Sequence, residues 1–278
     1  MNRAATIAAI VFALGALAPS AGAAEQTINA SEGVVSATLA YQGAAPATGG
    51  EPVKGLRLTI ERAGVKTYEA PVSSPHCGPP CGLEHFGGGP LLVRELEGAG
   101  EPSVVVELNT GGAHCCTIVQ VFSYDPATMA YRRAERDFGD PGALVTSVAG
   151  DRRLEFETAD DRFAYEFAPF AYSGLPLQIL AFREGRFRDV TRSFGAALSK
   201  DAAKWLKAFR TERRLQLGNG LIAAWAADEE LLGHDGLVRA TLSREAAHGH
   251  LHSREGYGPS GRSFVRALLR FLHRTGYR

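Results

Sequence analysis

Cysteine and histidine side chains gather in two short stretches of the sequence, HCGPPCGLEH at 76–85 and TGGAHCC at 110–116. Thiolate and imidazole are the ligands that zinc and copper prefer, so the two stretches together would make a mixed metal site. The histidines that would take part are His76, His85 and His114. Two points oppose this interpretation: the cysteines of CGPPC lack the usual two-residue spacing of a zinc knuckle, and an oxidising compartment consumes thiols.

The four cysteines, Cys77, Cys81, Cys115 and Cys116, are an even number, which in an exported chain predicts two disulfides. A bridge between the adjacent Cys115 and Cys116 needs a strained eight-membered ring, because neighbouring strand side chains point apart. We therefore expect two bridges from the CGPPC loop to the CC strand. The alternative is a local Cys77–Cys81 bridge that leaves a vicinal pair. We expect His114 to be a packed histidine bonded to the backbone.

A third histidine cluster, HGHLH, follows a predicted helix and precedes a Gly/Pro-rich stretch. It places His248, His250 and His252 at alternate positions, so an extended chain would present three imidazoles on one face and could bind zinc or nickel adventitiously. Because of its position we expect a solvated loop.

No known catalytic motif accompanies these clusters: the sequence has no nucleophile elbow, phosphate loop, dinucleotide fingerprint or HExxH helix. A hydrolase assembled from distant carboxylates such as Glu155, Asp161 and Asp189 is an alternative, although nothing in the sequence selects these three.

The first 24 residues predict export. One basic residue is followed by an apolar run and then by small residues, Ala21, Ala23 and Ala24, which is typical of a secretory signal peptide. The run is shorter than the ~20 residues that span a bilayer, and no later segment is long and apolar enough. We expect a secreted or periplasmic protein that is soluble after cleavage. Lys plus Arg equals Asp plus Glu, 30 against 30, which argues against nucleic acid as a partner.

The residues that carry chemistry must be positioned by two kinds of element. Before Ser193, apolar and polar residues alternate as in half-buried strands, for example in GLRLTIERAG, PSVVVELNT, CTIVQVFSYD and DRFAYEFAPF. FREGRFRDVT predicts a hairpin around Glu184 and Gly185. We therefore predict an α+β protein with a signal peptide at 1–24, a β-rich domain of antiparallel repeats at 25–193, blade-like or sandwich-like, and a helical domain at 194–278.

The helical part is predicted from apolar residues at helical spacing in 201–214, 220–233 and 263–274, which favours a bundle of three or four helices. From Gly195 onward the chain has 14 basic and 8 acidic residues. In the last helix, arginines recur every four residues. We expect them to form a solvated face, with acidic wall polymers or lipid headgroups as alternative partners.

Two segments of the strand-rich part echo each other about fifty residues apart, 91–108 and 144–160. The first contains ELEGAGEPSVVVEL, which resembles the DLDGDGEPEVVVDL turn of FG-GAP and VCBS-type repeats, the units of integrin-α-like propellers. TGGAHCC directly after it resembles a subgroup of uncharacterised secreted bacterial proteins with this repeat. The resemblance covers about 91–194 and implies blade-like β units, but a closed propeller needs more units than are recognisable.

The resemblance also implies calcium, which the family turn binds through alternating aspartates. Only Asp151 keeps an aspartate among the six corresponding positions, which are Glu95, Glu97, Ala99, Ser147, Ala149 and Asp151. We therefore expect turns that have lost their ion and no cofactor, with calcium and zinc as alternatives.

Taken together, these patterns predict an exported, non-catalytic binding or structural protein. Its partner would be an envelope polymer or another exported protein. The alternatives are an exported hydrolase that acts on envelope carbohydrate or peptide, and a metal-handling protein that uses His and Cys residues.

Overall fold

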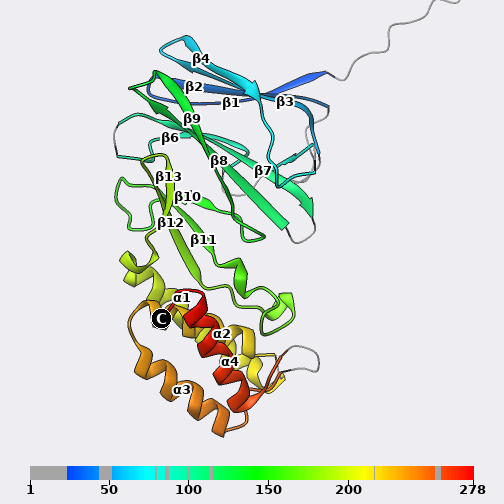
Figure 1. Ribbon diagram of the computed structural model, residues 1–278, viewed down its shortest axis with the longest axis vertical. Coiled ribbons are helices and arrows are strands. Elements are labelled where there is room, and N and C mark those ends of the chain that lie inside the picture. The colour runs from blue at the N-terminus through cyan, green and yellow to red at the C-terminus, as the bar shows by residue number, and fades with distance from the viewer. Residues whose placement is uncertain are drawn as a thin grey trace, which may run out of the picture.

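The computed structural model describes residues 24–43, 52–78, 80–84, 88–98, 100–112, 115–215, 217–253 and 258–278. The predicted signal peptide, except for Ala24, lies outside these residues, as do His85, Ala99 and His114. Within the described part, the chain builds three antiparallel sheets and then a group of helices, stacked in chain order along the long axis of the molecule (Figure 1).

Sheet A is a meander in which each strand pairs with the next one along the chain. Its strands are β1 (Glu25–Glu32), β2 (Val35–Gln42), β3 (Lys54–Arg62) and β4 (Val65–Pro71). The alternation predicted for GLRLTIERAG is confirmed, since Leu56, Leu58 and Ile60 are buried on one face of β3. That face contributes to the apolar core between sheets A and B.

Sheets B and C repeat the antiparallel arrangement, and the two echoed segments form corresponding hairpins in them, β6–β7 and β10–β11. Sheet B contains β5 (Gly82–Leu83), β6 (Leu91–Arg94), β7 (Ser103–Gly112), β8 (Cys115–Asp125) and β9 (Ala130–Asp137). Sheet C contains β10 (Leu144–Thr146), β11 (Glu155–Ala159), β12 (Leu177–Arg183) and β13 (Arg186–Asp189). The predicted hairpin at Glu184 and Gly185 joins β12 to β13.

The strand expected in DRFAYEFAPF is absent. Residues 160–172 instead form turns and two short 3₁₀ helices, η1 (Asp161–Phe163) and η2 (Phe170–Tyr172). The physical reason is that Phe163 and Phe167 both pack into the core of the helical part, where they contact Phe271 edge to face. The alternation of aromatic residues in this stretch therefore serves helix packing and not a sheet.

Four helices follow the sheets, α1 (Gly195–Glu212), α2 (Asn219–Leu231), α3 (Asp235–Ala247) and α4 (Gly261–Arg274), with short 3₁₀ turns η3 (Thr191–Ser193) and η4 (Arg213–Leu215) beside α1. α2 is buried around most of its circumference and carries Trp225, which is 1% exposed. The helices cap the end of sheet C, because Leu198 of α1 packs on Leu177 and Ile179 of β12. A pocket of about 570 Å³ opens beside this contact, between Glu157 and Leu177 of sheet C and the start of α1.

Each layer thus shares an apolar core with the next one. Sheets B and C enclose a second core that contains Val105, Val119, Phe156 and Phe182. This arrangement confirms the predicted fold class, a strand-rich first part followed by a small group of helices. None of the helices in the described part of the chain is long and apolar enough to cross a membrane.

Candidate functional site

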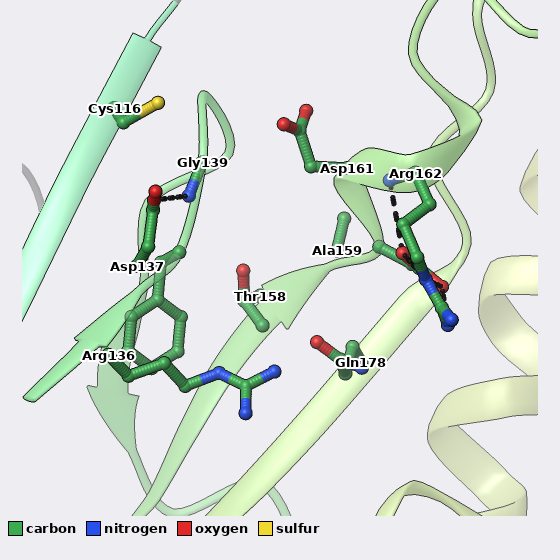
Figure 2. Close-up of a pocket in the computed structure, with 11 residues that line it drawn as sticks. Cys116, Arg136, Asp137, Gly139, Thr158, Ala159, Asp161, Arg162 and Gln178 are labelled. Atoms are coloured by element: carbon green, nitrogen blue, oxygen red, sulfur yellow. Dashed lines mark hydrogen bonds and ion pairs between the residues drawn. The ribbon is translucent and has the colours of Figure 1, made fainter. Parts of the chain in front are cut away.

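A polar cleft of about 530 Å³ opens where the ends of β8 and β9 face β11, β12 and η1 (Figure 2). Its charged lining residues come from two places that are distant in the sequence. β9 supplies Arg136 and Asp137, whereas the loop after β11 supplies Asp160, Asp161 and Arg162. The cleft therefore exists only because sheets B and C stack on each other.

Asp161 reaches across the cleft toward Gly139, the residue that turns the chain after β9. Gly139 has φ +65°, a conformation that favours glycine, and a Cβ there would lie 2.6 Å from Oδ2 of Asp161, so a larger residue would also displace that carboxyl group. Oδ1 of Asp161 is buried without a hydrogen-bond partner. Burial, followed by the nearby carboxylates of Asp140 and Asp137, raises the pKa of Asp161.

The neighbouring Asp160 has a structural role, because its carboxylate is held by hydrogen bonds within the protein. It is 4% exposed, and its carboxylate accepts hydrogen bonds from Nε and Nη2 of Arg162 and from the Tyr277 hydroxyl. It also caps η1 by accepting from the backbone N–H of Arg162. Because these donors occupy both oxygens, Asp160 fixes η1, the turn that places Asp161 at the cleft.

Arg136 lies on the sheet B side of the cleft with its guanidinium 5.6 Å from the centre of the Phe138 ring. Its Nε is buried and has no partner. Asp137, next to it, accepts from the backbone N–H of Gly139 at 2.8 Å and faces Nδ1 of His76 at 3.8 Å. The cleft thus brings acidic and basic side chains together, which suits a ligand that carries both donors and acceptors.

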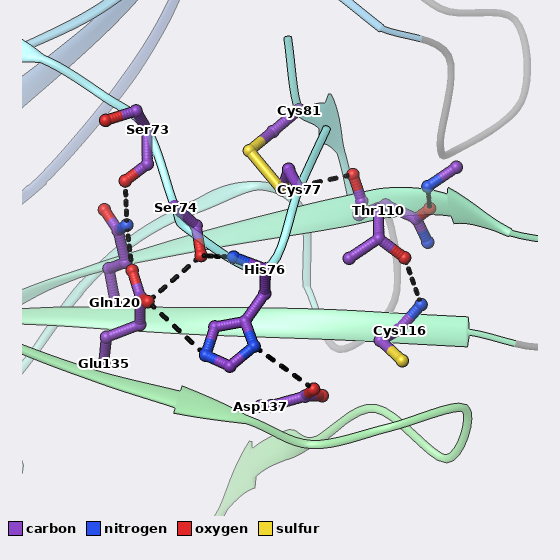
Figure 3. The surroundings of a disulfide bond; sticks show 12 residues. Ser73, Ser74, His76, Cys77, Cys81, Thr110, Cys116, Gln120, Glu135 and Asp137 are labelled. Atoms are coloured by element: carbon purple, nitrogen blue, oxygen red, sulfur yellow. Dashed lines mark hydrogen bonds and ion pairs between the residues drawn. A yellow bond between two sulfur atoms is a disulfide. The ribbon is translucent and has the colours of Figure 1, made fainter. Parts of the chain in front are cut away.

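His76 lies outside the cleft on the other side of Asp137, beside Glu135 (Figure 3). Its ring nitrogens are 3.9 Å from Glu135 and 3.8 Å from Asp137, and its side chain is 48% exposed. Glu135 also accepts from Ser74 and Gln120. Among the described residues, no three His, Cys, Asp or Glu side chains are placed to hold a metal ion together.

The expected cross-bridging of the cysteines is wrong. Cys77 pairs with Cys81, whose Cα atoms are 5.2 Å apart, within the usual range for a disulfide, and Cys115 pairs with Cys116. Figure 3 shows the Cys116 sulfur turned away from the Cys77–Cys81 bridge. The described residues contain no free cysteine, so none of the four supplies a thiolate to the proposed zinc or copper site.

The turn residues predicted as remnants of calcium sites accept hydrogen bonds from other parts of the same chain. Glu95 accepts from the backbone N–H groups of Glu97 and Gly98, and Glu97 accepts from the N–H of Gly185. Asp151 accepts from the backbone and guanidinium of Arg153. These carboxylates hold the turns and join sheet B to the β12–β13 hairpin.

The HGHLH stretch begins at the C-cap of α3 and continues as the predicted loop. Nδ1 of His250 lies 2.7 Å from Glu245, which also accepts from Arg213. The His248 and His250 rings contact each other with centroids 5.7 Å apart, whereas His252 belongs to neither contact. The three imidazoles do not form a common face.

The distant carboxylates of the hydrolase alternative are not brought together. Glu155 is buried and accepts from the N–H of Val148, and Asp189 accepts from Thr191. Of the three, only Asp161 lines the cleft.

Two buried carboxyl groups were not anticipated from the sequence, Glu107 on β7 and Asp228 on α2. Both are 0% exposed, and neither carboxyl oxygen of Glu107 has a hydrogen-bond partner, whereas Asp228 lies in hydrogen-bond contact with Asp201 and the backbone of Leu177. Burial, reinforced by Glu84, raises the pKa of Glu107 to about 8. Burial, reinforced by Asp201, raises the pKa of Asp228 to about 9. A single Glu within the apolar run VVVEL was the available signal for Glu107.

The chain is similar to two relatives over about half of its length. An uncharacterised protein of Sinorhizobium fredii, y4bJ, is 27% identical over 136 residues, which cover 48% of this chain and 21% of the relative. A protein of Synechocystis described as a probable thylakoid lumen protein, sll0997, is 31% identical over 147 residues, which cover 48% of this chain and 40% of the relative. The chain therefore spans less than half the length of these relatives. No family model and no solved structure matches it.

Proposed function

We propose that this is an exported, non-catalytic binding protein that holds a peptide segment of an envelope polymer in the cleft between sheets B and C. The observation that carries the proposal is that two acidic side chains, Asp137 and Asp161, and a basic one, Arg136, line one cleft. A ligand that carries both a cationic and an anionic group can pair with these side chains. Export is supported by the leader-like first 24 residues and by the description of one relative as a probable thylakoid lumen protein.

The chemistry of the lining favours a peptide over a sugar. Asp137 and Asp161 are suited to an ammonium group, and Arg136 is suited to a carboxylate, so a short peptide matches the cleft at both ends. Phe138 is the one aromatic residue among the described lining residues, and it is only 5% exposed. The lining therefore lacks the exposed aromatic surface on which a sugar ring would stack.

A binding role fits the carboxyl groups better than hydrolysis. General acid–base catalysis needs a second group that is free to exchange a proton with the substrate. Asp160, which precedes Asp161 in the sequence, is occupied by Arg162 and Tyr277, and Asp137 accepts from the backbone N–H of Gly139. Asp161 is then left to bind and to orient a ligand.

Calorimetric titration with stem peptides released from peptidoglycan tests the proposal. We expect saturable binding that Arg136→Ala and Asp161→Asn each weaken by about tenfold or more, since each removes a charge-assisted contact. The matched controls are Arg132→Ala and Asp151→Asn, which should retain affinity. Arg132 is an exposed arginine on the same strand as Arg136, and Asp151 is an exposed turn aspartate. An equal loss of affinity in the controls, or no binding of the peptides, would contradict the proposal. Release of new amino groups from the peptides would indicate a hydrolase.

We also infer that the three sheets are divergent FG-GAP or VCBS-like units whose turns have lost calcium. Support comes from the strand order, which follows the chain within sheets A and C, and from the echoed segments, which form corresponding hairpins. The turn carboxylates Glu95 and Asp151 already accept hydrogen bonds from the chain. Thermal melting with calcium and with a chelator should give the same midpoint; a shift of several degrees would contradict the loss of calcium.

A further inference from the structure

α4 carries four arginines at every fourth position, and all four are exposed: Arg262, Arg266, Arg270 and Arg274. We call these the arginine row. With a rise of 1.5 Å per residue, successive members are about 6 Å apart along the helix axis and the row is about 18 Å long. The 14 residues of α4 include no acidic side chain, so the positive charge is not offset within the helix.

The arginine row has no carboxylate partner in the described part of the chain. Arg266 donates to the hydroxyl of Ser263, and Arg274 lies over the ring of Phe271. Exposed arginines elsewhere behave differently, since Arg239 pairs with Asp235 and Arg188 pairs with Glu184. The guanidinium groups of the row therefore keep their capacity for an external anion.

Two further features preserve the positive charge of the arginine row. Among the acidic residues after Gly195, Glu230 pairs with Arg278 and Glu245 pairs with Arg213, so neither offsets the charge of the row through a direct contact. The row also ends in the last turn of α4, where the helix dipole favours cations.

We propose that the arginine row binds a linear anionic polysaccharide of the cell envelope, whose carboxylate or sulfate groups pair with successive guanidinium groups. Arginine suits this ligand because its planar fork binds such groups through two parallel hydrogen bonds. A polymer is favoured over a lipid surface because the apolar face of α4 is used inside the protein: Phe264, Leu268 and Leu272 are 0% exposed. No large apolar side chain of α4 is exposed that could insert into a membrane. The proposal goes beyond the peptide cleft and does not depend on it.

Binding of polygalacturonate and of dextran sulfate to the full chain, measured at several salt concentrations, tests the proposal. We expect Arg266→Gln with Arg270→Gln to weaken binding on the order of tenfold and to make the salt dependence shallower, because fewer counterions are released. The matched control is Arg188→Gln with Arg239→Gln, which removes the same charge from arginines that already have carboxylate partners. The control should change affinity by less than about twofold.

Three outcomes would overturn the proposal. Equal loss of affinity in the two double variants would show an effect of net charge alone, and an absence of binding to both polysaccharides would remove the ligand class. Binding to phosphatidylglycerol vesicles without binding to either polysaccharide would assign the row to a lipid surface. Asp161→Asn should leave polysaccharide binding unchanged, so failure of the peptide cleft and failure of the arginine row are distinguishable.

Discussion

The hydroxyl of Tyr277, the penultimate residue of the chain, donates a 2.9 Å hydrogen bond to Oδ2 of Asp160. Tyr277 is 5% exposed, and its ring packs edge to face on Phe163. The same carboxylate holds Arg162. The end of the chain therefore supports η1, the short helix that places Asp161 in the cleft.

Tyr277→Phe tests this support. Removing the hydroxyl deletes a hydrogen bond to a charged group in a buried setting, so we expect a loss of about 1.5–3 kcal/mol in the free energy of unfolding, measured in denaturant. Tyr165→Phe is the control, because Tyr165 is 55% exposed. A similar loss in both variants would show that the hydroxyl of Tyr277 has no special role.

Glu107→Leu should stabilise the protein. Glu107 buries a carboxyl group with no partner, and a leucine of similar size removes that penalty, which is about 1–3 kcal/mol. The measurement is the free energy of unfolding at about pH 8, where the folded and unfolded forms differ in protonation. Glu84→Leu is the contrasting variant: Glu84 accepts from Asn109 and Thr117, so its loss should destabilise. Destabilisation by Glu107→Leu would show that the carboxyl group is needed by the fold.

Asp228→Asn should flatten the dependence of stability on pH. The pKa of Asp228 is about 9 in the folded protein, against an ordinary value of 3.8. Between these values the folded protein keeps a proton that the unfolded chain has released, so the free energy of unfolding falls as pH rises, by up to about 1.4 kcal/mol per pH unit. Unfolding of both proteins at about pH 5 and about pH 8 measures the difference.

The advantage of Asp228→Asn over the wild type should therefore grow toward alkaline pH. Asp151→Asn is the control, because hydrogen bonds from Arg153 lower the pKa of Asp151 and its contribution is lost toward acid instead. An advantage of Asp228→Asn that is the same at both pH values would contradict the raised pKa.

The Cys77–Cys81 bridge closes a loop of five residues. Replacing both cysteines with alanine should lower the free energy of unfolding by about 2 kcal/mol through the entropy of the unfolded chain. For a chain of this size that corresponds to a melting temperature lower by about 4–8 °C. Peptide mapping without reductant checks the pairing directly: a peptide that joins the CGPPC loop to the CC strand would contradict it.

Much of the fold followed from local patterns. The alternation of Leu56, Leu58 and Ile60 predicted β3, and Glu184 with Gly185 predicted the β12–β13 turn, because in both cases neighbouring residues decide the structure. The strand predicted around Phe163 and Phe167 was wrong for the opposite reason, because distant residues decide the structure there. Its aromatic residues alternate as in a strand, but contacts with α4, about one hundred residues later, determine its shape.

The site was harder to predict, because its parts meet only after the sheets stack. Asp161 could be noted as a carboxyl group, but nothing in the sequence connects it to Gly139 or to Arg136. The cysteine clusters drew attention because of their residue types, yet their sulfurs pair within each cluster. Local composition thus identified reactive side chains, of which Cys116 and Asp161 line the cleft, and tertiary packing adds Arg136 beside them.

The order of the layers also governs how the chain can fold. Each layer shares its apolar core with the layer that follows it in the chain, so a segment that emerges first needs only the next one to become covered. Layers that are adjacent in space follow each other in the chain, as in a repeat protein, so each layer can form against the one before it. The last residues to pack are those of α4 and the segment after it. Phe271 and Tyr277 cover Phe163, which belongs to the loop that precedes β12.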